Sequence, residues 1–437
     1  MNAHPKNRSP NESESIVTTN WAGNVAFSAT DRIRPRSIDA VVDLVTGSRR
    51  LHAVGSGHSF SEVADTDGLH VDVSRLELEP ELRTRGGGPR TVVVPAGWTY
   101  WQVSVWLHER GYALRNLASL PHISVAGGVA TGTQGSGARN QSLAAQVRGI
   151  RLVDGLGQVR TLVIGDAAFD GAVVSLGLLG IVVAVELEVV PAFELAQYVT
   201  LRVPLRRVQD DLSSILSLGY STSVFTRWSD DRNVDSVWVK TEDGASHVAR
   251  GVPATADIHP VITEDAANTT AQLGVRGPWH ERLPHFRPDH SPSTGAELQS
   301  EFFVAAEHGP AMLTALRAIA PEFSPALQVN EIRAVAADRL WLSGAEGRDC
   351  VAFHFTWRPD LDRVLPALRL VEDAAERFDA RPHWGKLTTR SPERIAAAYP
   401  RWEQFLGLRA AMDPEDRFVN AFARRLMAPG ETGTRVS

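Results

Sequence analysis

The chain has 437 residues, of which 43% are hydrophobic and 22% charged, and its formal net charge is −6. That length allows two or three domains with a large core, and the lack of a long basic block argues against nucleic acid as a partner. A single cysteine, Cys350, excludes intrachain disulfides and cysteine-based metal sites. It suits a reducing compartment, so we expect a cytoplasmic protein without a metal site.

The N-terminal residues are polar, and no secretory signal is expected there. Residues 1–16 are predicted to be a disordered tail. The most apolar later stretch, residues 176–190, is interrupted by Glu186 and Glu188 and is too short to span a bilayer. It predicts a buried strand, and no contact with a membrane is expected.

The first part of the chain alternates between helical and strand-like patterns. Residues 37–50 predict a helix with Ser37 as its N-cap, and a strand over residues 51–54 leads from it into the sequence GSGHS. The elements expected after that are strands over 70–73 and 91–94, a helix over 99–110, a hairpin over 149–164, a helix over 167–175 and a strand over 181–190.

From about residue 194 the pattern changes. Strands are predicted over residues 236–240, 300–305, 327–335 and 351–357, and helices over 310–319 and 361–378. That order is typical of an α+β fold with a mixed or antiparallel sheet. The segment from residue 380 closes the chain.

Two loops of small residues are the most unusual feature. Residues 116–137 read NLASLPHISVAGGVATGTQGSG and contain no Lys, Arg, Asp or Glu. Such a stretch lets the backbone approach a ligand closely, and its glycines allow N–H groups to form an anion-binding nest. A second loop, VGSGHSF at residues 54–60, carries His58. Together the loops suggest a grip on a flavin diphosphate, although GSGHS is not the dinucleotide fingerprint GxGxxG and two unrelated surface turns are the alternative.

These loops occur with further motifs, namely EIR at 331–333, HFT at 354–356, HWGK at 383–386 and DPEDRFVNAF at 413–422. As a set they resemble the flavin-dependent alditol oxidases (xylitol or sorbitol oxidases) of the vanillyl-alcohol oxidase superfamily. The resemblance runs from about residue 20 to residue 422. It implies an FAD-binding domain over residues 17–193, a substrate-binding domain over 194–379, and a C-terminal segment, 380–437, that completes the FAD domain.

The resemblance implies FAD as cofactor, with His58 as its covalent attachment point. A neutral imidazole is a good nucleophile near pH 7, so the link is chemically reasonable, and a histidine packed without a bond is the alternative. Gln134 replaces a histidine of the family's TGTHGSG form, and its amide can still donate and accept. The other residues expected to contact FAD are Gly55, Ser56, Gly57, Ser59, Ser119, Ser124, Gly127, Thr131, Gly132, Thr133, Ile181 and His383.

Polyol oxidation requires a hydride to leave carbon and a proton to leave oxygen. The pKa of an alcohol lies roughly nine units above that of a free imidazole, a difference on the order of 12 kcal/mol. A lone base cannot bridge that difference, so positive charge must stabilise the developing alkoxide, or the hydride must leave in concert. We expect His354 to act as base while Arg333 and Lys386 hold the negative charge.

The strand periodicity supports this choice, because residues two apart share a face. Glu331 and Arg333 then lie together, as do His354 and Thr356. The residues expected to bind substrate hydroxyl groups are Glu331, Arg333, Thr356 and Ser119. An ordinary ion pair between Glu331 and Arg333, and a core role for His354, are the alternatives.

The leading hypothesis is therefore a monomeric oxidase that converts the terminal CH2OH of an alditol to an aldehyde and reduces oxygen to hydrogen peroxide. A second hypothesis keeps FAD but makes the protein an aldonolactone or sugar dehydrogenase with another electron acceptor. A third is a non-catalytic carbohydrate-binding protein that uses some of the eleven tryptophans as stacking platforms.

Overall fold

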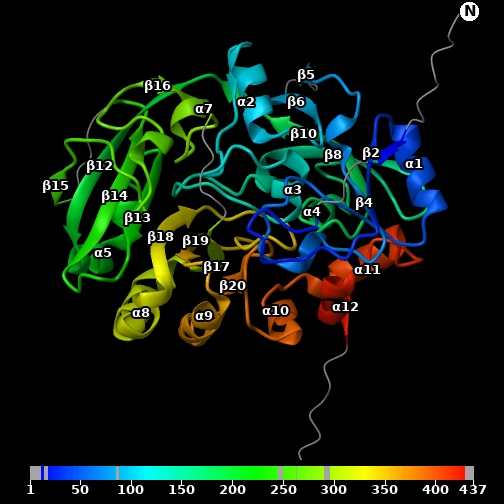
Figure 1. Cartoon of the computed structure of the whole chain (residues 1–437). Coiled ribbons are helices and arrows are strands. Elements are labelled where there is room, and N and C mark those ends of the chain that lie inside the picture. The colour runs from blue at the N-terminus through cyan, green and yellow to red at the C-terminus, as the bar shows by residue number, and fades with distance from the viewer. Residues whose placement is uncertain are drawn as a thin grey trace, which may run out of the picture.

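The computed structural model describes residues 11–13, 18–84, 88–244, 250–261, 263–289 and 296–428. Figure 1 shows two lobes, one built on the blue and cyan N-terminal strands and the other on a long green and yellow sheet. A row of helices from the C-terminal third, yellow to red, runs along one side of both lobes.

Two sheets form the first lobe. In one, β4 lies between β2 and β3 and is parallel to both, so the loop that follows β3 leaves from the carboxyl edge of parallel strands. The other is antiparallel, in the order β5-β6-β10-β8-β9. The bounds are β2 Asp31–Pro35, β3 Leu51–Ala53, β4 Leu69–Val71, β5 Glu81–Thr84, β6 Arg90–Pro95, β8 Val147–Val153, β9 Val159–Val163 and β10 Ile181–Glu188, with a small pair formed by β7 Tyr112–Ala113 and β11 Val190–Pro191.

Capping residues in the sequence determine where the two main helices of this lobe begin. Helix α1 (Ile38–Gly47) begins at Ser37, whose Oγ accepts from the Ala40 N–H at 3.1 Å, and its buried Val41 and Val45 pack on the first sheet. Helix α2 (Tyr100–His108) begins with a capping box formed by Thr99 and Gln102. Both confirm the predicted helices, with α1 ending earlier than expected.

Two short helices differ from the prediction. Residues 125–130, expected as loop, form α3 (Val125–Ala130). The predicted helix over 167–175 shrinks to α4 (Phe169–Ala172), because the β-branched Val173 and Val174 follow it and Leu176 adopts a φ of 56° that turns the chain toward β10.

The second lobe is a long sheet in which every described strand pair is antiparallel. The order is β15-β12-β14-β13-β18-β19-β17-β20, with β16 beside β12. This confirms the predicted α+β class. The bounds are β12 Glu194–Pro204, β13 Ser221–Thr226, β14 Asn233–Thr241, β15 Val252–Pro253, β16 Gly277–Pro278, β17 Leu298–Ala305, β18 Leu327–Val335, β19 Cys350–Trp357 and β20 Arg381–Pro382.

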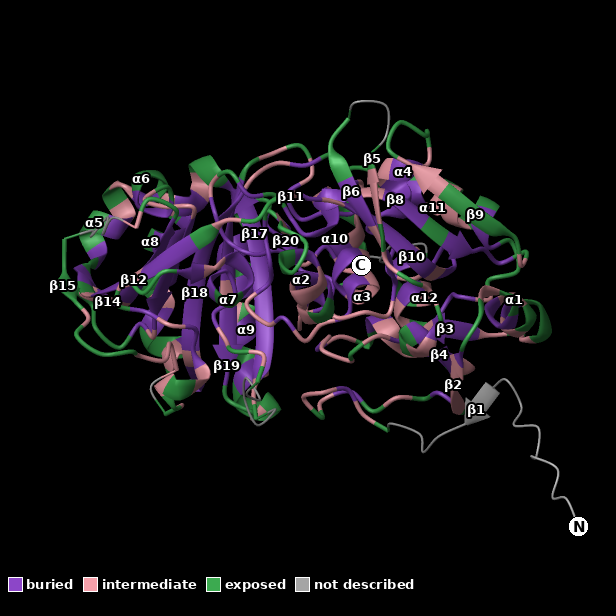
Figure 2. Ribbon diagram, turned by 90° about the horizontal axis from the view of Figure 1, so that it is seen from above, coloured by how far each residue is buried: buried purple, intermediate pink, exposed green. Residues whose placement is uncertain are grey.

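The long sheet has two unlike faces. Val351, Phe353, Phe355 and Trp357 of β19 point to an apolar core shared with the helices on that side, as the alternation predicted. Figure 2 shows β17, β18 and β19 buried along their length. The opposite face of the same strands carries polar residues. The helices of this lobe are α5 Leu205–Asp210, α6 Leu212–Leu216, α7 Trp279–Arg282, α8 Gly309–Phe323 and α9 Leu361–Glu376.

The C-terminal segment returns to the first lobe. It forms α10 Pro392–Ala397, α11 Trp402–Met412 and α12 Ala421–Met427, and the red helices lie beside the blue strands in Figure 1. Leu51 N–H donates to Arg417 C=O at 3.0 Å, and Phe418 joins the core under α1. The division into domains near residues 193 and 380 stays a prediction.

Part of the predicted disordered tail is ordered. Asn11–Ser13 form β1, which pairs antiparallel with residues 33–35 of β2, because the outer edge of that strand offers unpaired N–H and C=O groups. Residues 1–10 and 14–16 of the tail lie outside the described residues. Within the described ranges, the longest apolar helical segments are too short to cross a bilayer.

Candidate active site

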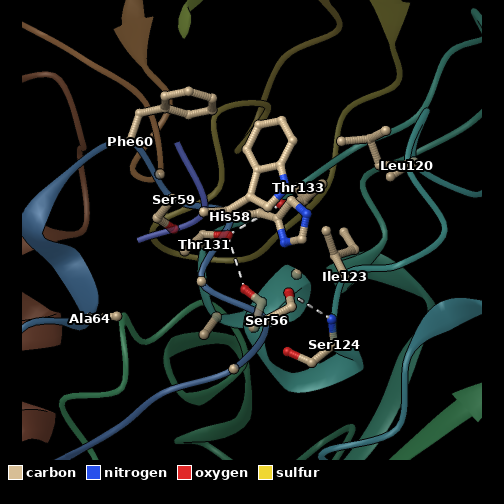
Figure 3. A pocket seen from close by; sticks show the side chains of 18 of the residues that line it. Ser56, His58, Ser59, Phe60, Ala64, Leu120, Ile123, Ser124, Thr131 and Thr133 are labelled. Carbon is tan, nitrogen blue, oxygen red and sulfur yellow. Dashed lines mark hydrogen bonds between the residues drawn. The ribbon is translucent and has the colours of Figure 1, made fainter. Parts of the chain in front are cut away.

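A cavity of about 450 Å³ lies between the two small-residue loops and the polar face of the long sheet. Figure 3 shows the loop side chains, with His58 and Ser56 from one loop facing Ser124, Thr131 and Thr133 from the other. The predicted cofactor residues that line the cavity are Gly55, Ser56, Gly57, His58, Ser59, Ser119, Ser124, Gly127, Thr131, Thr133, Gln134 and His383.

The two loops touch where Gly55 meets Ser124. A Cβ on Gly55 would lie 2.2 Å from Ser124 Oγ and would force that side chain to move, and within the second loop a Cβ on Gly127 would lie 2.7 Å from the same atom. Ser124 N–H donates to Ser56 Oγ at 3.2 Å. The sequence prediction that these distant loops meet is confirmed, and their contact leaves backbone exposed to the cavity.

Two of the predicted cofactor residues lie elsewhere. Ile181 is fully buried in the core between α1 and the first sheet, and its neighbours Gly180 and Val182 line the cavity instead. The alternation of β10 causes this, because successive side chains point to opposite faces. Gly132 is absent from the lining, and its φ of 66° turns the chain between Thr131 and Thr133.

The far end of the glycine-rich loop is pinned to the long sheet. Ser136 Oγ donates to Thr222 C=O at 2.5 Å, and Gly137 N–H donates to Ala334 C=O at 3.1 Å. Asn140 Nδ2 donates to Tyr220 C=O at 3.0 Å. The loop that lines the cavity is thus hydrogen-bonded to β13 and β18 within a few residues of Gln134.

Several buried polar atoms at the cavity have no hydrogen-bond partner among the described residues, namely His58 Nδ1, Ser124 Oγ, Gln134 Oε1 and His354 Nε2. Unsatisfied polar atoms are costly when buried, so a group of such atoms around one cavity fits a polar ligand. Together with the glycine cradle, they fit a nucleotide-type cofactor with phosphates and a polar ring. The described residues contain no His, Cys, Asp and Glu cluster able to hold a metal ion.

His58 is a neutral side chain held in place by an aromatic ring. Burial, with the charges of Lys386 and His122, lowers its pKa to about 4. Its ring stacks on Trp21 at a centroid distance of 5.1 Å and an interplanar angle of 19°. A neutral imidazole with an unpaired nitrogen can form a bond at that nitrogen.

On the sheet side, register brings charged residues together. Glu331 on β18 stands opposite His354 on β19, and Glu301 on β17 stands opposite His354 from the other side. Arg333 Nη2 lies 2.7 Å from Glu301 Oε1, and Arg333 Nε lies 3.6 Å from Glu331 Oε2. Gln134 Nε2 donates to Glu301 Oε1 at 2.6 Å, so the unusual glutamine connects the loop to this cluster.

The two ring nitrogens of His354 have different surroundings. Its Nδ1 lies 3.8 Å from Glu331 Oε2, and its Nε2 is buried without a partner. Burial lowers the pKa of His354, against the opposing effects of Glu331 and Glu301. The side chain is therefore a neutral imidazole, and it lines the cavity.

Lys386 supplies a cation at the same wall. Its ammonium donates to Gln299 Oε1 and lies 5.0 Å from the centre of the Phe60 ring. Burial lowers its pKa to about 8, although Glu301 opposes the shift. Thr356 lines the same wall from β19, opposite Gln299 on β17.

His383 is held within its own turn. Its Nδ1 accepts from Gly385 N–H at 3.0 Å, its ring stacks on Phe303 at 6.1 Å, and burial lowers its pKa to about 3. His122, in the glycine-rich loop, has its Nε2 2.8 Å from Pro288 C=O and is not part of the lining.

Several polar residues of this region were not predicted from the sequence, namely His285, Glu297, Gln299 and Glu301 in the cavity lining and Lys240 behind it. A signal was present for three of them: Glu297, Gln299 and Glu301 alternate at the spacing of one strand face. His285 and Lys240 carry no such local signal, because contacts across the fold bring them to Glu331.

Comparison with known proteins agrees with this geometry. The FAD binding domain family matches residues 32–163, and the D-arabinono-1,4-lactone oxidase family matches residues 296–426. The alditol oxidase of Streptomyces sp. (strain IKD472) is 44% identical over 94% of this chain and 99% of its own. The L-gulono-1,4-lactone dehydrogenase of Mycobacterium tuberculosis is 27% identical over 95% of this chain and 100% of its own.

Solved structures share the fold. A cholesterol oxidase from B. sterolicum superposes with a TM-score of 0.79 over 98% of this chain and 99% of its own, at 13% identity. A solvent-stable cholesterol oxidase gives a TM-score of 0.78 at 15% identity, over 97% and 100% of the two chains. With the identity to the Streptomyces enzyme along nearly all of both chains, these findings show that the chain belongs to the alditol oxidase family of FAD-dependent, vanillyl-alcohol-oxidase-type oxidoreductases.

Proposed function

We propose that this protein oxidises the terminal primary alcohol of an alditol such as xylitol or sorbitol to the aldehyde, with oxygen reduced to hydrogen peroxide. The observation that carries the proposal is a buried, neutral His354 with an unpaired Nε2, flanked by two cations and facing the cavity of the glycine-rich loops. When bound, FAD supplies the hydride acceptor and passes the electrons to oxygen.

The loops would hold FAD. Uncharged backbone at Gly55 to Ser59 and at the residues around Gly127 and Thr131 suits a diphosphate, and Ser119, Ser124 and His383 add polar atoms from the same walls. The family resemblance and the two sheets support a division in which residues 17–193 and 380–437 bind FAD and residues 194–379 bind substrate.

The sheet residues would handle the proton. His354 Nε2 takes the hydroxyl proton, and Arg333 and Lys386 stabilise the negative charge that develops on the substrate oxygen. Glu331, Thr356 and Ser119 bind further hydroxyl groups, which orients the terminal carbon. Positive charge is required because an imidazole alone is far too weak a base for an alcohol.

A direct assay separates the proposed oxidase from its alternative. The purified holoenzyme in air should consume xylitol or sorbitol and release an equimolar amount of hydrogen peroxide. The alternative, an aldonolactone or sugar dehydrogenase, is favoured by the similarity to the M. tuberculosis enzyme. It would instead reduce an acceptor dye with L-gulono-1,4-lactone and release little peroxide, and that result would replace the first proposal.

We also propose that His58 is bonded covalently to the flavin, because its Nδ1 has no hydrogen-bond partner in the described structure and its ring, stacked on Trp21, lines the cavity. Acid precipitation of the wild-type protein should give a yellow pellet. His58→Ala should give a white pellet and a yellow supernatant, while His122→Ala, a neighbouring histidine outside the lining, should behave as wild type. Flavin in the wild-type supernatant would contradict the link.

A further inference from the structure

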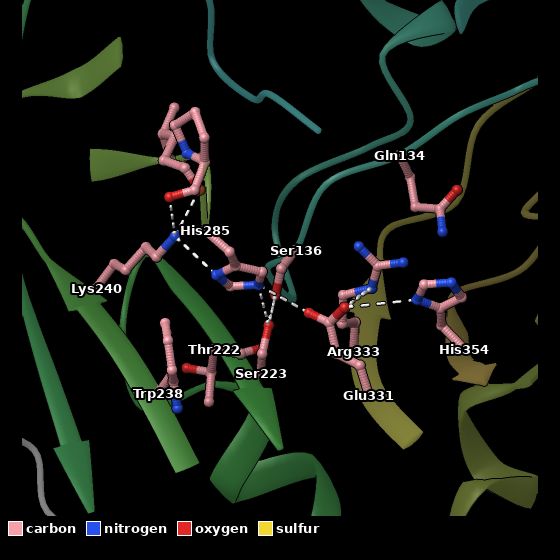
Figure 4. Close-up of polar contacts among 12 residues, drawn as sticks. Gln134, Ser136, Thr222, Ser223, Trp238, Lys240, His285, Glu331, Arg333 and His354 are labelled. Carbon is pink, nitrogen blue, oxygen red and sulfur yellow. Dashed lines mark hydrogen bonds and ion pairs between the residues drawn. The ribbon is translucent and has the colours of Figure 1, made fainter. Parts of the chain in front are cut away.

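Two buried basic residues extend the hydrogen-bond chain of the active-site wall into the sheet (Figure 4). Lys240 on β14 is 1% exposed, and its Nζ lies 2.5 Å from Leu283 C=O, 3.1 Å from Pro284 C=O and 3.3 Å from His285 Nδ1. His285 Nε2 lies 2.8 Å from Glu331 Oε1. Figure 4 shows the connection continuing from Glu331 to His354.

The acceptors in this series of hydrogen bonds determine which atoms carry the protons. A carbonyl can only accept, so Lys240 donates to both backbone oxygens. Burial raises the pKa of Glu331, but Arg333 and His285 outweigh it and hold that pKa well below its usual value. Glu331 is therefore a carboxylate, which can only accept a hydrogen bond. The hydrogen between the two groups must then be carried by His285 Nε2.

His285 can then have only one tautomer. Burial and the charge of Lys240 lower its pKa to about 4, so the ring is neutral and its Nδ1 accepts. The Lys240 ammonium has three N–H groups, of which two donate to the backbone oxygens. The third donates to His285 Nδ1, so all three are used. Burial lowers the pKa of Lys240 to about 7, above that of His285, so the shared proton belongs to the lysine.

Glu331 faces further groups on its other side. Its Oε1 is occupied by His285, and its Oε2 faces His354 Nδ1 at 3.8 Å and Arg333 Nε at 3.6 Å. The separation from His354 is longer than a hydrogen bond, but the negative charge of the carboxylate still favours a hydrogen on the nitrogen that faces it, which is Nδ1 of His354. Its lone pair is then on Nε2, a buried atom without a partner in a side chain that lines the cavity.

We propose that Lys240 and His285 are positioning residues that act through Glu331 to fix the tautomer and orientation of His354, leaving Nε2 as the nitrogen that takes the substrate proton. This inference rests on the proposed function, in which His354 is the base. Ser223 Oγ, 3.3 Å from His285 Nε2, is a weaker second acceptor, and Phe225 and Trp238 enclose the ring edge-on.

A pH dependence follows. Above about pH 7 a deprotonated Lys240 has two N–H groups for three acceptors, so the fixed tautomer of His285 is lost. The charged and titratable groups facing Lys240 are Glu331, Arg282 and His285, and those facing His354 are Glu331, Glu301, Arg333, Lys386 and His383. Substrate oxidation should therefore slow above about pH 7, and this loss should depend on Lys240.

The test is anaerobic reduction of the holoenzyme flavin by xylitol, followed by stopped flow across pH 5 to 9. Lys240→Met and His285→Phe should slow reduction by at least about 10-fold, up to the roughly 10⁴-fold known where a base is left in the wrong tautomer. His285→Gln should recover much of the rate, because its amide can donate to Glu331. Thr222→Val is the matched control, since Thr222 Oγ1 is equally buried on the adjacent strand and has no partner in the described structure.

A second readout distinguishes positioning from general damage. Nitrogen-15 NMR of histidine-labelled holoenzyme should show His354 protonated at Nδ1 in the wild type and a mixture of tautomers in Lys240→Met, with unchanged flavin content. The Lys240→Met rate should also lose its decrease near pH 7, leaving only titrations such as that of Lys386.

Other outcomes overturn the inference. An unchanged rate and pH profile in Lys240→Met would do so, as would a slower rate with the His354 tautomer unaltered, which means structural damage alone. The His354→Ala variant distinguishes a failure of the positioning role from a failure of the proposed function. If it abolishes flavin reduction while Lys240→Met is silent, the positioning role fails and the proposed function stands; if His354→Ala reduces normally, the proposed function fails.

Discussion

Glu301 holds a buried negative charge among basic side chains at the cavity wall. Arg333 and Gln134 both donate to its Oε1, at 2.7 and 2.6 Å, and the side chain is 2% exposed. Burial raises its pKa, but Arg333, His354, His383 and Lys386 together lower it to about 2. With Glu331, it balances the charges of Arg333 and Lys386, so the wall can keep two cations in a desolvated place.

Replacing Glu301 with Gln should destabilise the protein by about 3 kcal/mol, because removing one partner of a buried pair leaves the other charge uncompensated. Chemical denaturation at pH 7 measures the change. Glu77→Gln is the control, since Glu77 pairs with Arg36 at the surface, where both side chains are more than half exposed, and it should change stability by less than about 0.5 kcal/mol. Equal effects of the two substitutions would contradict the account of Glu301.

The residues of the wall differ in how far the sequence reveals them. Glu331, Arg333, His354 and Thr356 are recognisable because a strand places residues two apart on one face, and short motifs mark that face. Glu301 acquires its role only when β17 pairs with β19, a contact between segments about fifty residues apart that no local pattern specifies.

At the scale of elements, the strands and helices that bury a regular apolar stripe were predictable, such as β18 and α9. The eleven-residue β12 was not, because charged residues such as Glu194 and Arg202 interrupt its apolar pattern and its pairing partners decide its length. The helices after residue 380 were likewise missed. They gain most of their stability from docking on the first lobe rather than from their own sequence.

Asn420 shows what that docking depends on. Its Oδ1 caps α12 by accepting from Ala423 N–H at 2.9 Å, and its Nδ2 donates to Val63 C=O at 3.0 Å and Asp65 C=O at 2.8 Å. These bonds join the C-terminal helix to the 3₁₀ turn η1 (Glu62–Ala64), which follows the His58 loop.

Asn420→Ala should therefore cost about 3 kcal/mol, from one cap of about 1 kcal/mol and two further hydrogen bonds of about 1 kcal/mol each. Ser37→Ala removes only a cap, that of α1, and should cost about 1 kcal/mol. Denaturant unfolding of both variants tests the difference. If Asn420→Ala costs no more than Ser37→Ala, the link between α12 and η1 contributes nothing.

At the scale of the whole molecule, the class of fold and the meeting of the two loops were predictable, because glycine-rich loops and alternating strands leave clear patterns. The burial of many histidines was not, since it depends on the packed structure. Burial lowers the pKa of His58, His70 and His285 to about 4 and that of His383 to about 3.

Histidines with lowered pKa values make the folded protein less stable at acidic pH. Below pH 6.5 the unfolded chain binds protons that the folded protein does not, so the free energy of unfolding falls as pH drops from about 6.5 toward 4. His70, whose Nε2 donates to Ala64 C=O at 2.9 Å, contributes about 3 kcal/mol to that fall. His70→Gln keeps a donor and should reduce the loss between pH 7 and 4 by that amount, as measured by urea unfolding; an unchanged loss would show that His70 binds a proton when folded.

The pinning of the glycine-rich loop to the long sheet limits how parts can be exchanged between relatives of this chain. Ser136, Gly137 and Asn140 fasten to backbone groups of residues 220–222 and 334–336, so both walls of the cavity share one frame. A chimaera that takes its loop from one parent and its sheet from another keeps these bonds only if the sheet backbone of the second parent lies in the same position. To change the substrate preference by exchanging segments between relatives, the glycine-rich loop and residues 220–222 and 334–336 therefore have to be transferred together.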